Sequence, residues 1–186
     1  MRREFPPSLL FLVTAVLCGT ASAEPDRRPA PGSMNRVIRA DVAAARAIAL
    51  RKLESPTCRM VFSDFADSEG RSLRSNLETR GETAADLMRR LTFLNGSGES
   101  PCKHDGVLAF TTPRTTGISI CGPAFRKALR NQPDLAANIL IHEELHSLGL
   151  QELSRFARPP MRQEKNGNRP PTSSEINDGV AARCGL

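Results

Sequence analysis

The chain has 186 residues, a formal net charge of +6, and no tryptophan or tyrosine. Its length is sufficient for a domain with a hydrophobic core. The basic residues are mostly arginines scattered along the chain, whereas a nucleic-acid-binding surface would need a clustered basic stripe. We therefore interpret the charge as a solvated surface and expect no nucleic-acid partner.

The first 23 residues have the pattern of a secretory signal peptide. Arg2 and Arg3 form a basic start, an apolar run follows over residues 9–17, and Ala21-Ser22-Ala23 supplies a cleavage site of small residues. The apolar run is too short to span a bilayer, which needs ~20 apolar residues, and no later segment is long enough. We expect a secreted or periplasmic protein without stable membrane insertion.

The rest of the chain divides into a short leader and one domain. Residues 24–33 are rich in proline and arginine and predict a flexible leader. Residues 34–186 are expected to form a single domain, and we expect it to be a monomer. Its first part predicts a long helix over residues 34–54, which Pro56 ends, and then a strand over residues 58–65.

The middle of the chain predicts short elements that alternate between helix and strand. Residues 71–78 fit no single pattern. The other elements are a helix over 83–91, a strand over 92–94, a β-hairpin of strands 106–112 and 116–121, and a helix over 123–130. Residues 153–171 are polar and predict a mobile loop. Thr172-Ser-Ser-Glu175 is a capping-box pattern that predicts a last helix ending at about Arg183.

Cysteine usage predicts a disulfide framework. A cut after Ala23 leaves Cys58, Cys102, Cys121 and Cys184, and an even number in an exported protein indicates two disulfides. Sequence alone allows three pairings. We favour Cys102–Cys121, because these residues flank the predicted hairpin, which leaves Cys58 to pair with Cys184.

A helix predicted between Leu135 and Gly149 contains the most informative motif, His142-Glu143-x-x-His146. At about 100° per residue the two histidines lie within roughly 40° of each other, so both can bind one metal ion while Glu143 lies beside it. The rest of this helix is apolar on nearly every face, which predicts burial. Buried histidines and a buried glutamate need partners, and a zinc ion would provide one.

A catalytic zinc site uses three protein ligands, and the sequence offers two candidates for the third. In a continuous helix Glu152 would lie roughly 120° around the axis from His146 and more than a turn further along, out of reach. Gly149 can end the helix in a left-handed conformation and turn Glu152 back beneath the metal. The alternative is Glu175, at the start of the last helix. Glu164 has a poorer sequence context.

With these residues the sequence resembles the zincin metallopeptidases, and more narrowly the metzincin pattern HExxHxxGxxH/D with Glu152 in the last position. The resemblance implies an α+β fold with a small mixed sheet, a buried active-site helix and flanking helices. It also implies an edge strand, here 106–112, that aligns an extended peptide. A methionine turn below the metal is a further feature of the group, and Met161 is the only methionine after the motif.

The leading functional hypothesis is a secreted zinc peptidase that acts on peptides or proteins. Zinc would activate a water molecule, and Glu143 would act as general base. An alternative is a secreted zinc-binding or interaction domain without hydrolytic activity, and a third is a disulfide-bonded exported protein without metal. Glu144 is expected at the surface or behind the site, and His104 in an exposed turn.

Overall fold

The central element of the fold is helix α7 (Pro133–Ser147), which carries the HExxH motif. The computed structural model describes residues 34–153 and 169–186, so the expected signal peptide, the leader and most of the 153–171 loop lie outside the described residues. All residues of α7 from Ala136 to Ser147 are buried. The predicted burial of this helix is therefore confirmed.

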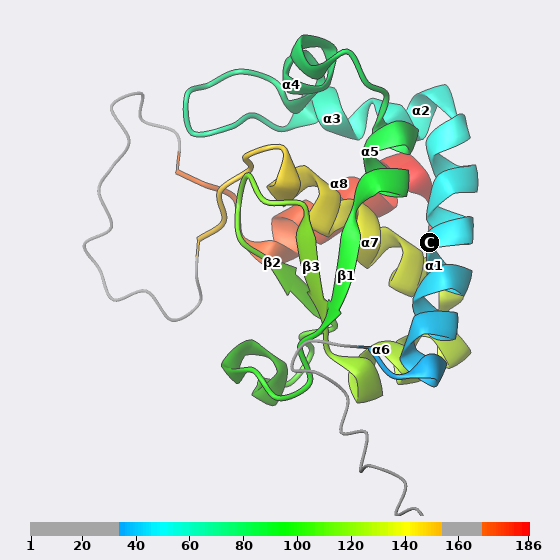
Figure 1. The fold of residues 1–186 in the computed structure, drawn as a ribbon. Helices are drawn as coiled ribbons and strands as arrows, with labels where there is room; N and C mark the ends of the chain where they lie inside the picture. The colour runs from blue at the N-terminus through cyan, green and yellow to red at the C-terminus, as the bar shows by residue number, and fades with distance from the viewer. Residues whose placement is uncertain (1–33, 154–168) are drawn as a thin grey trace, which may run out of the picture.

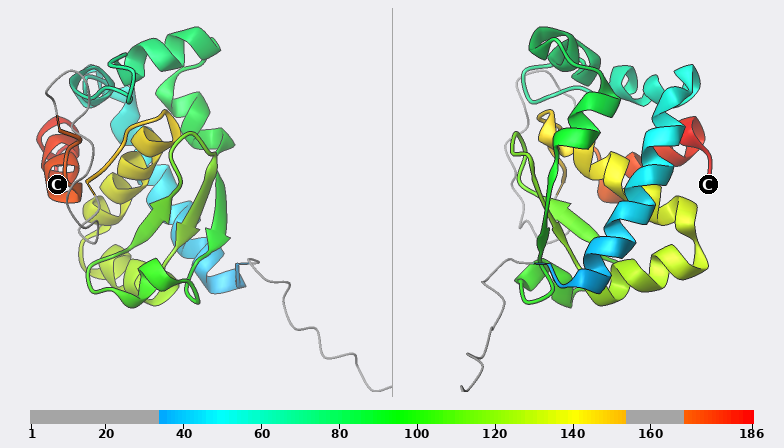
Figure 2. Two further views of the ribbon diagram at one scale, coloured as in Figure 1. Left: turned by 90° about the vertical axis from the view of Figure 1, so that its left-hand side faces the viewer. Right: turned by 45° about the vertical axis from the view of Figure 1, so that its right-hand side comes forward.

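Helix α7 is buried because other elements cover it on several sides. A three-stranded sheet lies on one side and α8 (Ser173–Cys184) on the other, as the left view of Figure 2 shows. Helix α1 (Arg36–Glu54) crosses it, and α6 (Gly122–Asn131) leads into it (Figure 1). Among the described residues, no helix is long and apolar enough to cross a bilayer.

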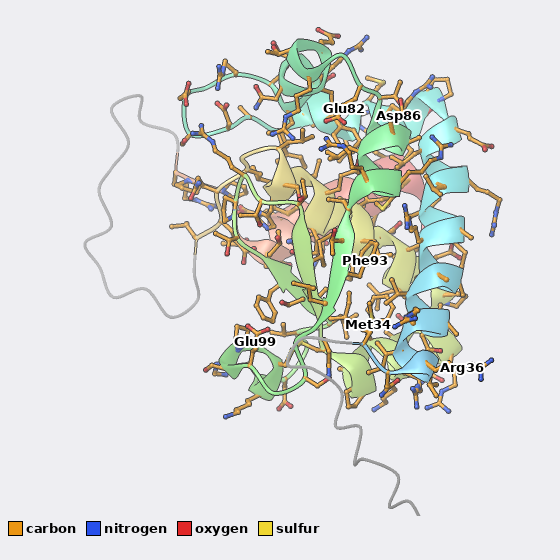
Figure 3. All side chains as sticks on the ribbon, viewed as in Figure 1. Met34, Arg36, Glu82, Asp86, Phe93 and Glu99 are labelled. Atoms are coloured by element: carbon orange, nitrogen blue, oxygen red, sulfur yellow. A yellow bond between two sulfur atoms is a disulfide. The ribbon has the colours of Figure 1, made fainter. Side chains whose placement is uncertain are left out.

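The sheet is small and mixed, as predicted. It consists of β1 (Thr92–Asn95), β2 (Ala109–Thr111) and β3 (Gly117–Ile120), in the order β1-β3-β2. Strand β3 runs parallel to β1 and antiparallel to β2. Figure 3 shows Phe93 on β1, and the Arg46 guanidinium of α1 lies over its ring, 5.8 Å from the ring centre. Within the described residues, β2 is thus an edge strand.

The predicted strand over residues 58–65 is wrong. This segment forms two short helices, α2 (Pro56–Arg59) and α3 (Val61–Asp64). The buried residues are Cys58, Val61 and Phe62, a spacing of three and four that belongs to a helix, whereas a strand would have buried Met60 with Cys58 and Phe62. The Met60 side chain is instead exposed.

The remaining elements follow local signals in the sequence. They are α4 (Leu73–Arg80), α5 (Ala84–Arg90) and a 3-10 turn, η1 (Ser100–Lys103). The segment that fitted no pattern is therefore largely helical. The predicted capping box at Thr172 and Glu175 is present: the Thr172 hydroxyl accepts from Glu175 N–H, and the Glu175 carboxylate accepts from Thr172 N–H.

Both predicted disulfides are present. Cys102–Cys121 joins η1 to the end of β3, and Cys58–Cys184 joins α2 to the last residue of α8. Their sequence separations are 19 and 126 residues. The long-range bridge therefore connects two helices, and not a strand to a helix as the sequence suggested.

The two bridges should stabilise the protein unequally. In the chain-entropy model, the longer loop corresponds to about 5 kcal/mol and the shorter to about 3 kcal/mol. We expect the pair Cys58→Ala and Cys184→Ala to lower the free energy of unfolding more than Cys102→Ala and Cys121→Ala. Denaturant titration of both double variants measures this difference, and equal losses would contradict it.

Candidate metal centre

The two histidines and the first glutamate of the motif lie on one stretch of α7. Exposed fractions are 3% for His142, 5% for Glu143 and 5% for His146, so all three are removed from bulk water. Their spacing places both imidazoles on one side of the helix. Glu144 points the other way: it is fully buried at 0% exposure, and burial followed by the nearby charge of Glu82 raises its pKa well above the usual range. Of the two positions expected for Glu144, at the surface or behind the site, the surface position is wrong.

Gly149 ends the helix in the way that the sequence suggested. Its φ is +111°, a backbone conformation that residues other than glycine rarely adopt. Gly149 N–H donates to the His146 carbonyl at 2.9 Å, and Leu150 N–H donates to the Leu145 carbonyl at 3.2 Å. These two bonds form a Schellman motif, which turns the chain back on itself.

The turn brings Glu152 to the two histidines. Nε2 of His142 and Nε2 of His146 are 3.0 Å apart. Glu152 Oε2 lies 3.2 Å from His146 Nε2 and 3.6 Å from His142 Nε2. Donors on a tetrahedron with metal bonds of about 2.0–2.1 Å would be roughly 3.3–3.4 Å apart. The three atoms therefore fit around one four-coordinate metal ion, and this group can hold one.

The other ring nitrogens are already bound to the protein. His146 Nδ1 lies 2.9 Å from the Leu150 carbonyl oxygen, which can only accept, so Nδ1 carries the proton. His142 Nδ1 lies 2.8 Å from Asn177 Oδ1 of α8. Both Nε2 atoms are thus left to donate their lone pairs. Two lone pairs and a carboxylate oxygen that face one another call for a cation between them.

The close approach of His142, His146 and Glu152 shifts the pKa values of Glu152 and His146. Burial works against the charge on Glu152, yet the adjacent His142 and His146 side chains lower its pKa to about 2. Burial also works against a charge on His146, while the adjacent Glu152 carboxylate and the charge of Glu143 raise its pKa. Glu152 is therefore an anion at neutral pH, as a metal ligand must be.

The other candidate for the third ligand, Glu175, is not close to the two histidines. Glu175 lies outside the group, because its carboxylate binds Arg169 and the N-terminus of α8 at Thr172. Glu164 and Met161 lie outside the described residues. Among the described residues, His142, His146 and Glu152 form the only group of three or more histidine, cysteine, aspartate or glutamate side chains that could hold a metal.

Glu143 has one bound and one free oxygen. Its carboxylate accepts the main-chain N–H of Thr111, while Oε2 is buried without a hydrogen-bond partner among the described residues. Burial raises the pKa of Glu143, against the opposing effect of His142 and His146. A carboxylate with a raised pKa and a free oxygen beside a metal group is suited to take up and release a proton.

A cleft of about 620 Å³ opens in front of these residues. The segment 107–111, which includes β2, lines the cleft, as do Ser100, Pro101 and residues 104–106. Leu108 carbonyl accepts Cys121 N–H and Phe110 pairs with Ser119, so these residues face β3. By alternation, Ala109 and Thr111 turn their main-chain groups toward the cleft. His104 is exposed, as expected, and lines this cleft.

Sequence reasoning missed the partners that orient the histidines. The one detectable signal was Asn177, which shares a helix face with the buried residues Ile176 and Val180 of α8. The Leu150 carbonyl and the Thr111 N–H are main-chain groups and leave no mark in the sequence.

Comparison with protein-family models, with curated proteins and with solved structures finds no significant match to this chain. The class of protein therefore has to be inferred from the site itself.

Asn177 should matter for metal binding although it touches no metal. Asn177→Ala removes the acceptor that fixes the His142 ring, and we expect a metal dissociation constant raised roughly 10- to 100-fold. Asp178→Ala, an exposed neighbour on α8, serves as the control. Competition with a chromophoric chelator measures both, and equal affinities would refute the orienting role.

Proposed function

We propose that the protein is a secreted zinc-dependent peptidase in which His142, His146 and Glu152 bind the metal. The observation that carries the proposal is Glu143. A buried carboxylate with a raised pKa and a free oxygen stands next to the metal group on the same helix. Proton transfer at a metal is the chemistry of hydrolysis, and a carboxylate in this position is suited to it.

The donor set is consistent with zinc. Two histidines and a carboxylate with an open fourth position are typical of catalytic zinc sites. The same donors also occur in non-haem iron sites. Glu143 favours zinc, because water activation needs an adjacent base and oxygen chemistry at iron does not.

The cleft supports a peptide as the substrate. Ala109 presents its N–H and C=O to the cleft, and Thr111 presents its C=O, while the Thr111 N–H is occupied by Glu143. An extended peptide can pair with such an edge through its own main chain. Such pairing would bring the scissile bond beside Glu143, at the Thr111 end of β2.

The steps assigned to this chain follow from these positions. Bound zinc would polarise the scissile carbonyl and lower the pKa of water to about 7. Glu143 Oε2 would accept the water proton and deliver it to the leaving amine. Thr111 N–H holds the other oxygen of Glu143, so the carboxylate keeps one orientation during both transfers. Two disulfides are compatible with an extracellular location.

The test compares two adjacent carboxylates. Glu143→Gln should retain about one equivalent of zinc and lower kcat/KM on a quenched peptide library by about 10²- to 10⁴-fold. Glu144→Gln is the matched control, because Glu144 is equally buried but faces away from the site, and it should retain activity. Elemental analysis measures the metal.

The results separate the alternatives. Zinc without any cleavage by the wild type would support a zinc-binding or interaction domain. Iron in place of zinc, or no metal at all, would overturn the proposal. Equal loss of activity in both variants would show that the effect comes from the helix and not from a general base.

A further inference from the structure

The turn after α7 is held by groups from distant parts of the chain. The His146 carbonyl accepts Arg114 N–H at 3.0 Å in addition to Gly149 N–H. The Leu148 carbonyl accepts Asn76 Nδ2 of α4 at 3.0 Å. The last carbonyls of a helix have no partners within it, so the Asn76 bond satisfies the Leu148 carbonyl, and the Arg114 bond gives the His146 carbonyl a second donor. They also fix the point at which the chain turns toward Glu152.

Asn76 is itself oriented by Asp67. One hydrogen of the Asn76 amide points to Leu148, and the other to Asp67 Oδ2 at 3.0 Å. A carboxylate can only accept, so the amide cannot turn over without placing its oxygen against two acceptors. Asp67 therefore determines that Asn76 presents a donor to the Leu148 carbonyl.

Asp67 is in turn fixed by several donors. Its Oδ1 accepts Glu69 N–H at 2.9 Å and Arg71 N–H at 3.0 Å, and its Oδ2 accepts the Arg71 guanidinium at 3.1 Å and 3.2 Å. Burial acts to raise the pKa of Asp67, but hydrogen bonds, first from Asn76, lower it to about 2. The carboxylate is charged at any physiological pH.

These groups also contact the turn directly. A Cβ added at Gly149 would lie 3.3 Å from Asp67 Cβ and 3.3 Å from Arg114 Nε. On the other side of Glu152, Leu153 N–H donates to the Pro171 carbonyl at 2.9 Å. Glu152 thus lies on a short segment that is held by hydrogen bonds at Leu148 before it and at Leu153 after it.

We propose that Asp67 and Asn76 form a positioning latch, which holds the turn at Leu148 and Gly149 and thereby places Glu152 as the third metal ligand. The latch touches neither the metal nor a substrate. The inference rests on the metal centre of the proposed function and is independent of hydrolysis.

The test measures cobalt(II) binding, because the absorption of bound cobalt reports its coordination. Asn76→Ala should raise the cobalt dissociation constant about tenfold or more, as loss of an outer partner typically does. Its spectrum should shift toward that of Glu152→Ala. Asn35→Ala is the control: it removes the N-cap of α1 and one hydrogen bond to Ile38 N–H, which lowers stability without a link to the turn.

A double-mutant cycle shows whether the latch acts through Glu152. In the Glu152→Ala background, Asn76→Ala should change the cobalt affinity by less than about twofold. A tenfold loss in both backgrounds would overturn the inference, since Asn76 would then act on the histidines. An unchanged affinity in Asn76→Ala, or a wild type that binds no cobalt, would overturn it too. Cobalt binding without peptide cleavage would refute only the proposed hydrolysis.

A second variant covers the case in which Asn76→Ala does not fold. Asp67→Asn keeps the shape of the side chain but leaves one accepting oxygen, which can serve either the Glu69 and Arg71 N–H groups or the Asn76 amide. We expect the same change in the cobalt spectrum and a smaller loss of affinity. A folded Asp67→Asn protein with the wild-type spectrum and affinity would contradict the latch.

Discussion

The fold depends on the burial of polar groups inside a helix that has no exposed face. Removing two imidazoles and the Glu143 carboxylate from water is costly unless each finds a partner. In α7 each partner comes from a different element: α8 through Asn177, β2 through Thr111, and the reversed chain through Leu150 and Glu152. The helix therefore connects the sheet with α8 and the turn, and the surrounding elements have to be in place before the site exists.

The residues of the site that could be predicted are those that lie close together in the sequence. His142, Glu143, His146 and Glu152 lie within eleven residues, where helical geometry and one glycine decide the outcome. The partners Asn177 and Asn76 lie 35 residues after His142 and 72 residues before Leu148. Only the tertiary arrangement brings them close, so a local pattern could not reveal them.

The fold shows the same limit. The capping box at Thr172 and Glu175 was predictable, because few residues can fulfil this role at that spacing, and an even cysteine count limited the disulfides to three pairings. The segment 58–65 was misassigned, because a short apolar run fits either a strand or a helix until the exposed side is known. The exposure of Met60 and the burial of Glu144 could not be predicted from the sequence, because both depend on what packs against these residues.

The edge of β2 also matters for aggregation. An unpaired strand edge is a template on which a second chain can extend the sheet, and natural proteins keep such edges short or occupied. Strand β2 has three residues, and Glu143 binds the outward N–H of Thr111. The carboxylate beside the metal group therefore also occupies one outward main-chain group of this edge, which shortens the stretch on which an aggregate could grow.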